Sequence, residues 1–173
     1  MIRRIMAALG GEGFGSSDFS IRLVLKWFLI QKIIGFNRHV PWPAHWSSKI
    51  IAPDKIVRGS RFPGLGMGCH IDGRNGIIFG SNVWIGPRVT FISMNHSTSN
   101  YHEWVAEDPI RVGNDCWFGA NSVVLPSVVL GDHTVVAAGA VVTKSFPEGN
   151  QILAGNPAKV AKEISNYLHT ATR

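Results

Sequence analysis

The chain has 173 residues, of which 45% are hydrophobic and 16% charged; this composition is typical of one globular domain and excludes a disordered chain. Seventeen Lys and Arg against eleven Asp and Glu give a net charge of +6. That charge favours anionic partners, such as a phosphorylated cofactor or an anionic membrane face. The basic residues are spread along the chain without an RNA-binding or helix-turn-helix signature, so we expect no nucleic acid partner.

Residues 1–48 are predicted to form an N-terminal unit that precedes the repeats. Residues 1–18 contain four glycines and too short an apolar run for a signal peptide, so we interpret them as a mobile or weakly docked arm. Residues 19–36 are the most lipophilic segment, and Arg22, Lys26 and Lys32 interrupt it, which favours an amphipathic helix over a membrane span. This helix either packs on the repeats or a neighbouring subunit, or makes peripheral contact with a membrane. A connector rich in Pro and Trp follows it.

From Phe79 to Lys144 an aliphatic or aromatic anchor returns every six residues. A helix would rotate such anchors off a common face, so the spacing predicts short strands joined by corners. Three repeats would close a triangular coil of about 18 residues that buries its apolar row on the next coil. The anchors are Phe79, Ile85, Phe91, Val112, Phe118, Val124, Leu130, Val136 and Val142.

A second inward row is predicted at the fourth position after each anchor, where the residues are small or apolar. Both cysteines, Cys69 and Cys116, fall at this position, so we expect them to pack inward without forming a disulfide or binding a metal. A reducing cytoplasm is then the default compartment. Gly, Asn and Asp gather between the rows, where they tolerate the dihedral angles of corners. Trp84 and Trp117, five residues after an anchor, should point outward.

The six-residue spacing stops between Phe91 and Val112, where a polar and aromatic loop, residues 92–110, is inserted. A loop held by a regular scaffold is a common place for catalysis. His96 follows a strand end closely and is better fixed than His102, and an imidazole is a usual general base near neutral pH. A catalytic and a structural role for His96 are about equally consistent with these facts alone. Glu103, Glu107, Asp108 or a backbone carbonyl could orient it.

Five segments, residues 85–87, 95–96, 109–119, 138–144 and 154–160, resemble the hexapeptide-repeat acyltransferases of the maltose and galactoside O-acetyltransferase type. Among these, the chain looks most like the enzymes of bacterial surface-polysaccharide synthesis. The ordered motifs are Trp-x-Gly, Val-Thr-Lys and Gly-Asn-Pro-Ala-Lys. The resemblance implies a left-handed parallel β-helix over residues 49–160, a short C-terminal tail or helix over residues 161–173, and a homotrimer with active sites between its subunits.

The resemblance also implies an O-acetyltransferase that moves an acetyl group from acetyl-CoA to a sugar or glycan hydroxyl, without a metal. His96 matches the catalytic base, and the N–H of Ala120 matches the donor that stabilises the oxyanion. The positions that match the cofactor site are Trp117, Gly119, Ala120, Ala138, Thr143, Lys144, Lys159 and Lys162.

The acceptor site departs from the family, which often has an asparagine and an aspartate near Gly68 and Gly73. Our candidates for acceptor contacts are His70, Asp72, Arg74, Asn75, Asn95 and His102. Two other functions compete with acetyl transfer. One is a zinc carbonic anhydrase with His70, His96 and His102 as ligands; the other is a repeat scaffold without catalytic activity.

Overall fold

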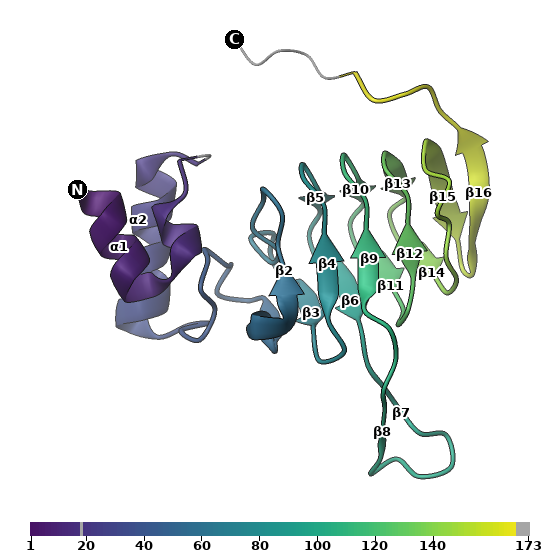
Figure 1. The fold of residues 1–173 in the computed structure, drawn as a ribbon, viewed down its shortest axis with the longest axis horizontal. Coiled ribbons are helices and arrows are strands. Elements are labelled where there is room, and N and C mark those ends of the chain that lie inside the picture. The colour runs from purple at the N-terminus through teal and green to yellow at the C-terminus, as the bar shows by residue number, and fades with distance from the viewer. Residues whose placement is uncertain (18, 169–173) are drawn as a thin grey trace.

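A computed structural model describes residues 1–17 and 19–168. It confirms the predicted parallel β-helix, in which stacked coils form three sheets (Figure 1). Sheet A contains β1 (Lys49–Ile51), β3 (His70–Asp72), β6 (Thr90–Ile92), β11 (Val123–Val124) and β14 (Val141–Val142). Sheet B contains β2 (Ile56–Val57), β4 (Ile77–Phe79), β9 (Ile110–Val112) and β12 (Val129–Leu130). Sheet C contains β5 (Trp84–Ile85), β10 (Trp117–Phe118), β13 (Thr134–Val136), β15 (Gln151–Gly155) and the antiparallel β16 (Ala158–Glu163). We name the corners between consecutive sheets the A–B, B–C and C–A edges.

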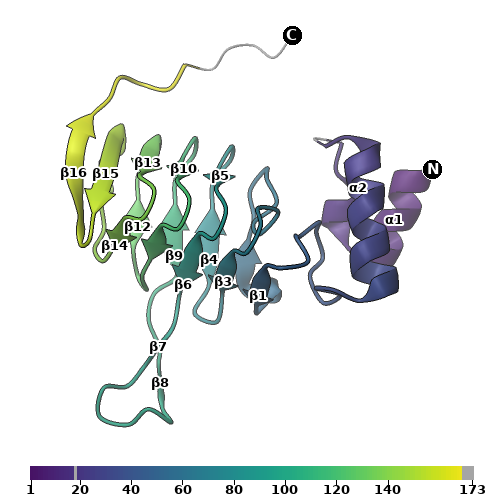
Figure 2. The same cartoon turned by 180° about the vertical axis from the view of Figure 1, so that it is seen from behind.

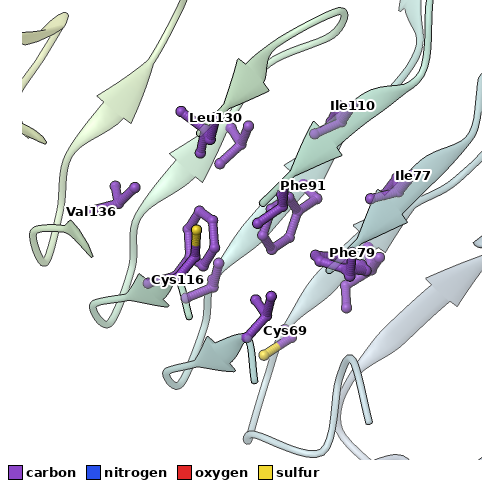
Figure 3. Packing of buried hydrophobic residues seen from close by; sticks show 14 of the residues in the cluster. Cys69, Ile77, Phe79, Phe91, Ile110, Cys116, Leu130 and Val136 are labelled. Atoms are coloured by element: carbon purple, nitrogen blue, oxygen red, sulfur yellow. The ribbon is translucent and has the colours of Figure 1, made fainter. Parts of the chain in front are cut away.

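Both predicted inward rows form the core (Figure 3). Every anchor from Phe79 to Val142 is buried except Ile85, which is half-buried and packs against the core. The rings of Phe79, Phe91 and Phe118 contact one another in T-shaped pairs, with centroids 5.0 and 4.9 Å apart. The fourth-position residues are buried as well, and both cysteines are free thiols inside the coils.

The residues of the corners serve two separate structural purposes, which the sequence pattern does not distinguish. The left-handed backbone conformation on the B–C edge belongs to Asn82, Asp115, His133 and Asn150, with φ between 47° and 56°. The glycine that follows an anchor has another purpose, because a Cβ on Gly119 would lie 2.5 Å from the amide nitrogen of Ala138 in the next coil. Glycine there allows two coils to approach closely.

The N-terminal unit is more ordered than the sequence predicts. The interpretation of residues 1–18 as a mobile or weakly docked arm is wrong for the described part. Helix α1 (Ile2–Gly10) buries Met6, the 3-10 helix η1 (Glu12–Gly15) buries Phe14, and the Arg3 guanidinium donates to the Phe19 carbonyl at 2.7 Å. Gly10 lies where a Cβ would be 2.9 Å from the Phe14 ring, so this glycine serves packing.

The predicted amphipathic helix is present as α2 (Ile21–Phe28), continued by the π-helix η2 (Leu29–Ile34). Trp27 is buried, Leu23 and Ile30 are half-buried, and Ile34 is exposed. The buried Gln31 ties the helix to the connector, since its Nε2 donates to the Trp42 carbonyl at 3.1 Å. Another short 3-10 helix, η3 (Pro53–Lys55), lies between β1 and β2. No helix in the described ranges is long and apolar enough to span a bilayer.

The short C-terminal helix expected within residues 161–173 is not formed by residues 161–168. Residues 158–163 form β16 instead, which pairs with β15 at the end of sheet C. The free edge of the last coil offers unpaired backbone groups, and a strand satisfies them whereas a helix cannot. The chain then returns over the coils (Figures 1 and 2). Residues 169–173 lie outside the described residues.

Candidate functional site

The insert is a β-hairpin that projects from the A–B edge between β6 and β9 (Figures 1 and 2). Its strands are β7 (Asn95–His96) and β8 (Trp104–Val105), which pair antiparallel with Asn95 opposite Val105 and His96 opposite Trp104. The flanking β6 and β9 keep their places in sheets A and B, so the hairpin has a fixed base.

His96 is exposed, and two contacts define its orientation. Its Nδ1 lies 2.5 Å from the Tyr101 carbonyl oxygen, and its ring stacks on Trp104 with centroids 3.8 Å apart and planes at 35°. A carbonyl can only accept, so Nδ1 carries the hydrogen in the neutral ring and Nε2 keeps the lone pair. The arrangement suits a base, and a backbone carbonyl holds the ring.

None of the three acidic side chains considered for this purpose contacts His96. Glu103 accepts from the Asn100 side chain at 2.7 Å. Glu107 accepts from the Ser127 hydroxyl at 2.9 Å, and the backbone carbonyl of Asp108 faces the same hydroxyl at 3.4 Å.

Three of the predicted acceptor residues instead support the base of the hairpin. The Asp72 carboxylate is buried and paired with Arg74 at 2.5 Å, and the Arg74 guanidinium lies 3.9 Å from the Trp104 ring centroid. Burial acts to raise the pKa of Asp72, but the hydrogen bonds and charge of Arg74 outweigh it and hold that pKa below its ordinary value. The Asn75 amide donates to the Val105 carbonyl at 2.9 Å.

The other candidate acceptor residues are more scattered. Asn95 is exposed on β7 beside His96. His102 is exposed toward the hairpin tip, where its backbone N–H donates to the Asn100 side chain at 3.1 Å. His70 lies on β3, opposite Thr90 of β6, and is only half-exposed. The structure therefore brings Asn95 next to His96 and leaves His70 on sheet A.

Two of the predicted cofactor residues share a single row across sheet C. Trp117 lies opposite Trp84 on one side and Val135 on the other; Val135 lies opposite Ile152, and Ile152 opposite Lys162. Both tryptophans are about half-exposed, with 51% for Trp84 and 56% for Trp117. The prediction that they point outward is confirmed.

A groove of about 460 Å³ lies along this row. It is lined by Trp84, Asp115, Trp117, His133, Val135 and Tyr167. Tyr167 comes from the returning C-terminal segment, where its ring meets His133 edge to face at 5.2 Å and its hydroxyl accepts from Asn82 at 3.2 Å. The groove thus combines indole faces with a polar rim, which suits a ligand with apolar and polar parts.

The remaining predicted cofactor residues fall in separate places. Gly119, Ala120 and Ala138 lie on the C–A edge, beside the row of sheet C. No hydrogen bond in the described part of the chain uses the N–H of Ala120 or Ala138. Thr143 and Lys144 follow β14 on the A–B edge, and Lys159 is exposed on β16. Sheet A therefore separates the A–B edge, with its hairpin, from the C–A edge within one chain.

Among residues 1–17 and 19–168, no three His, Cys, Asp or Glu side chains are arranged to hold a metal ion. The three histidines considered as zinc ligands are separated, since His70 lies in sheet A, His96 stacks on Trp104 and His102 is near the tip.

Trp104 is the residue of this site that sequence reasoning missed. The run Ser-Thr-Ser-Asn, residues 97–100, lies between β-forming residues and is a hairpin signal that would have placed Trp104 near His96. Trp84 was predicted to be outward but not to belong to the row of Trp117.

Comparisons with known proteins agree with this architecture. Residues 109–144 match the family model described as the hexapeptide repeat of succinyl-transferase. The chain is 37% identical over 95 residues to the galactoside O-acetyltransferase of Escherichia coli (strain K12), a match that covers 52% of this chain and 45% of that protein.

Two solved structures extend the comparison. A maltose O-acetyltransferase from Clostridium difficile 630 is 25% identical with a TM-score of 0.57, over 69% of this chain and 64% of that one. A hexapeptide-repeat acetyltransferase of Vibrio cholerae O1 biovar eltor, complexed with acetyl coenzyme A, is 24% identical with a TM-score of 0.56, over 95% and 88%. The latter likeness concerns the fold.

The chain matches less than half of the length of the first curated relatives. The matched region nevertheless includes the coils that carry the Trp-x-Gly motif, and the parallel sheets follow the same six-residue pattern. Residues 109–144 therefore carry the hexapeptide repeat, and the chain is similar in sequence and in fold to these acetyltransferases.

Proposed function

We propose that the protein is an acetyl-CoA-dependent O-acetyltransferase that acts on a sugar or glycan hydroxyl, with His96 as its general base. The observation that carries the proposal is the exposed His96 ring, whose Nδ1 is held by the Tyr101 carbonyl so that Nε2 is free to accept a proton. A glycan intermediate of polysaccharide synthesis in the cytoplasm would be a suitable acceptor.

In the proposed reaction, Nε2 of His96 removes the proton of the acceptor hydroxyl while the oxygen attacks the thioester carbonyl carbon. The N–H of Ala120 donates to the oxygen on which negative charge develops. The carbon–sulfur bond then breaks, and the imidazolium returns its proton to the leaving CoA sulfur. The row from Trp117 to Lys162 would hold CoA, with indole faces against its apolar arm and Lys162 toward its phosphates.

A homotrimer is part of the proposal because one chain separates the two halves of the site. The hairpin with His96 leaves the A–B edge, whereas Ala120 and Ala138 lie on the C–A edge. A second copy that places its C–A edge beside the hairpin would complete the site. Sedimentation equilibrium should then give three times the monomer mass, and a monomer with full turnover would contradict this arrangement.

Release of CoA from acetyl-CoA tests the activity, with maltose and methyl β-D-galactopyranoside as acceptors chosen from the names of the similar enzymes. We expect His96→Gln to lower kcat by about 100-fold or more while leaving the affinity for CoA unchanged. His39→Gln is the matched control, since His39 lies in the connector and contacts the Ile50 carbonyl. Full turnover by His96→Gln would eliminate His96 as the base.

We further propose that residues 19–36 contact an anionic membrane surface at the inner face. Leu25, Leu29 and Ile33 leave 44%, 45% and 68% of their surface exposed, on the helical face opposite the buried Val24 and Trp27. Helices α1, α2 and η2 contain five Lys or Arg and no acidic residue. The protein should sediment with phosphatidylglycerol vesicles and less with phosphatidylcholine, and Leu25→Gln/Leu29→Gln should abolish this. Equal sedimentation of the variant would refute it.

A further inference from the structure

We infer that Trp104 and Arg74 are positioning residues, which hold the His96 ring in the orientation that a base requires. The inference rests on the proposed function, because it assigns these residues a task in the same site. Neither side chain was predicted to act on His96, and Arg74 was predicted to contact the acceptor.

The first step of the argument is the sandwich around the Trp104 indole. The His96 ring centroid lies 3.8 Å from the indole centroid, and the guanidinium carbon of Arg74 lies 3.9 Å from it. Two planar groups cannot both lie over one indole face at these distances, so they occupy opposite faces. The indole is thereby clamped between a cation and an imidazole, and stacking of both kinds is favourable.

The second step is that Arg74, which lies on the face of the indole opposite His96, is anchored to the coils of the β-helix. Asp72 is the last residue of β3 and its side chain is 3% exposed. Its two oxygens accept from Nε and Nη2 of Arg74, at 2.9 and 2.5 Å, so the guanidinium plane is fixed by a two-pronged contact. A chain of contacts therefore runs from Asp72, where β3 ends at the A–B edge, through Arg74 and Trp104 to His96.

The third step is that the hairpin needs such support. It pairs only two residues on each strand, and an isolated hairpin of that size is marginally stable in water. The Asn75 amide secures the backbone of β8 at Val105, but it does not reach the imidazole. The stack on Trp104 and the Tyr101 carbonyl are the two contacts that orient the ring itself.

The test compares Trp104→Phe, Trp104→Ala and Arg74→Lys with the wild type and with Trp46→Ala, an exposed tryptophan of the connector. Histidine ring protons are observed by NMR in isotope-labelled protein, and those of His96 are the ones absent from His96→Gln. Stacking should shift them upfield in the wild type, in Trp104→Phe and in Trp46→Ala. The shift should vanish in Trp104→Ala and decrease in Arg74→Lys, because lysine lacks the planar fork. Unshifted His96 protons in the wild type would overturn the inference, whatever the protein catalyses.

Kinetics then separates positioning from a general effect on stability. We expect Trp104→Ala to lower kcat by about 10- to 100-fold, with the KM for acetyl-CoA within about twofold of wild type, and Trp104→Phe to restore most of the loss. The double variant Trp104→Ala/His96→Gln should be no slower than His96→Gln, since both changes remove the same contribution. Multiplied losses, or an unchanged kcat in Trp104→Ala, would refute positioning. A fully active His96→Gln would instead refute the proposed function, and the NMR comparison would still decide whether the clamp exists.

Discussion

The close approach of neighbouring coils can be tested at one atom by replacing Gly119 with alanine. The added Cβ would lie 2.5 Å from the Ala138 nitrogen and 2.9 Å from its Cα, whereas ordinary contact begins at 3.4 Å. The two backbones must therefore separate by about 1 Å. Gly119 does not adopt a positive φ, so backbone strain at this position does not contribute.

The magnitude follows from the hydrogen bonds that join these coils. The Gly119 N–H donates to the Val136 carbonyl at 2.7 Å, and the Gly139 N–H donates to the Ala120 carbonyl at 2.9 Å. A separation of about 1 Å lengthens both beyond the usual limit of about 3.2 Å. Two lost bonds at about 1 kcal/mol each, added to about 1–3 kcal/mol for overpacking, predict that the free energy of unfolding falls by about 3 kcal/mol or more.

Urea unfolding at equal protein concentration measures this change. Gly139→Ala is the matched control, because Gly139 has a φ of 72° and a Cβ added to it would meet no atom within 4 Å. It should cost only about 1 kcal/mol, from the left-handed backbone conformation. If Gly119→Ala were as stable as the wild type, or more stable than Gly139→Ala, steric contact between coils would not explain the glycine that follows five of the nine anchors.

Three further predictions concern single groups. Burial raises the pKa of the Cys116 thiol to about 11 and also raises the pKa of the Cys69 thiol. Dithionitrobenzoate at pH 8 should therefore label both thiols at least about 100-fold more slowly in the native protein than in urea. Rapid labelling of the native protein would contradict this. The pKa of Asp72 is lowered in the folded state, so its stabilising effect is present above its unfolded value of about 4 and is lost as the pH falls through the folded one. Thermal unfolding should therefore show Asp72→Asn to be less stable than wild type at pH 7, with a smaller difference at pH 3, and an equal difference at both would refute the assignment. Lys162→Ala should weaken CoA binding about fivefold by calorimetry, whereas Lys49→Ala should leave it unchanged. If both variants weakened CoA binding equally, the charge of Lys162 would have no specific role in binding CoA.

The six-residue spacing was sufficient to predict the coils and both inward rows, because burial of an apolar residue at a fixed interval is a local property of the sequence. Spacing also located the insert and the exposed His96. It could not predict the Trp104 stack, which depends on the register of the hairpin. The course of residues 158–168 was also beyond it, because β16 turns back and pairs antiparallel with β15, the strand directly before it, and so leaves the six-residue register.

The glycines show that the residue type alone does not predict why a residue is needed at a corner. Glycine, asparagine and aspartate all favour corners, and the sequence therefore suggested one common reason for them. In the structure, Asn82 and Asp115 adopt the left-handed conformation, whereas Gly80 and Gly113 leave room for the next coil. Only the contact between coils distinguishes the two reasons.

The place where the hairpin leaves the coils has a consequence for how this protein can diversify. Thr90 of β6 still pairs with Val123, and Ile110 of β9 still pairs with Ile77, as if no residues intervened between the two strands. The length and content of residues 93–109 can therefore change without altering the phase of any coil before or after them. Under the proposed function, substitutions in this segment would alter recognition of the acceptor while the pairing of the coils stays constant.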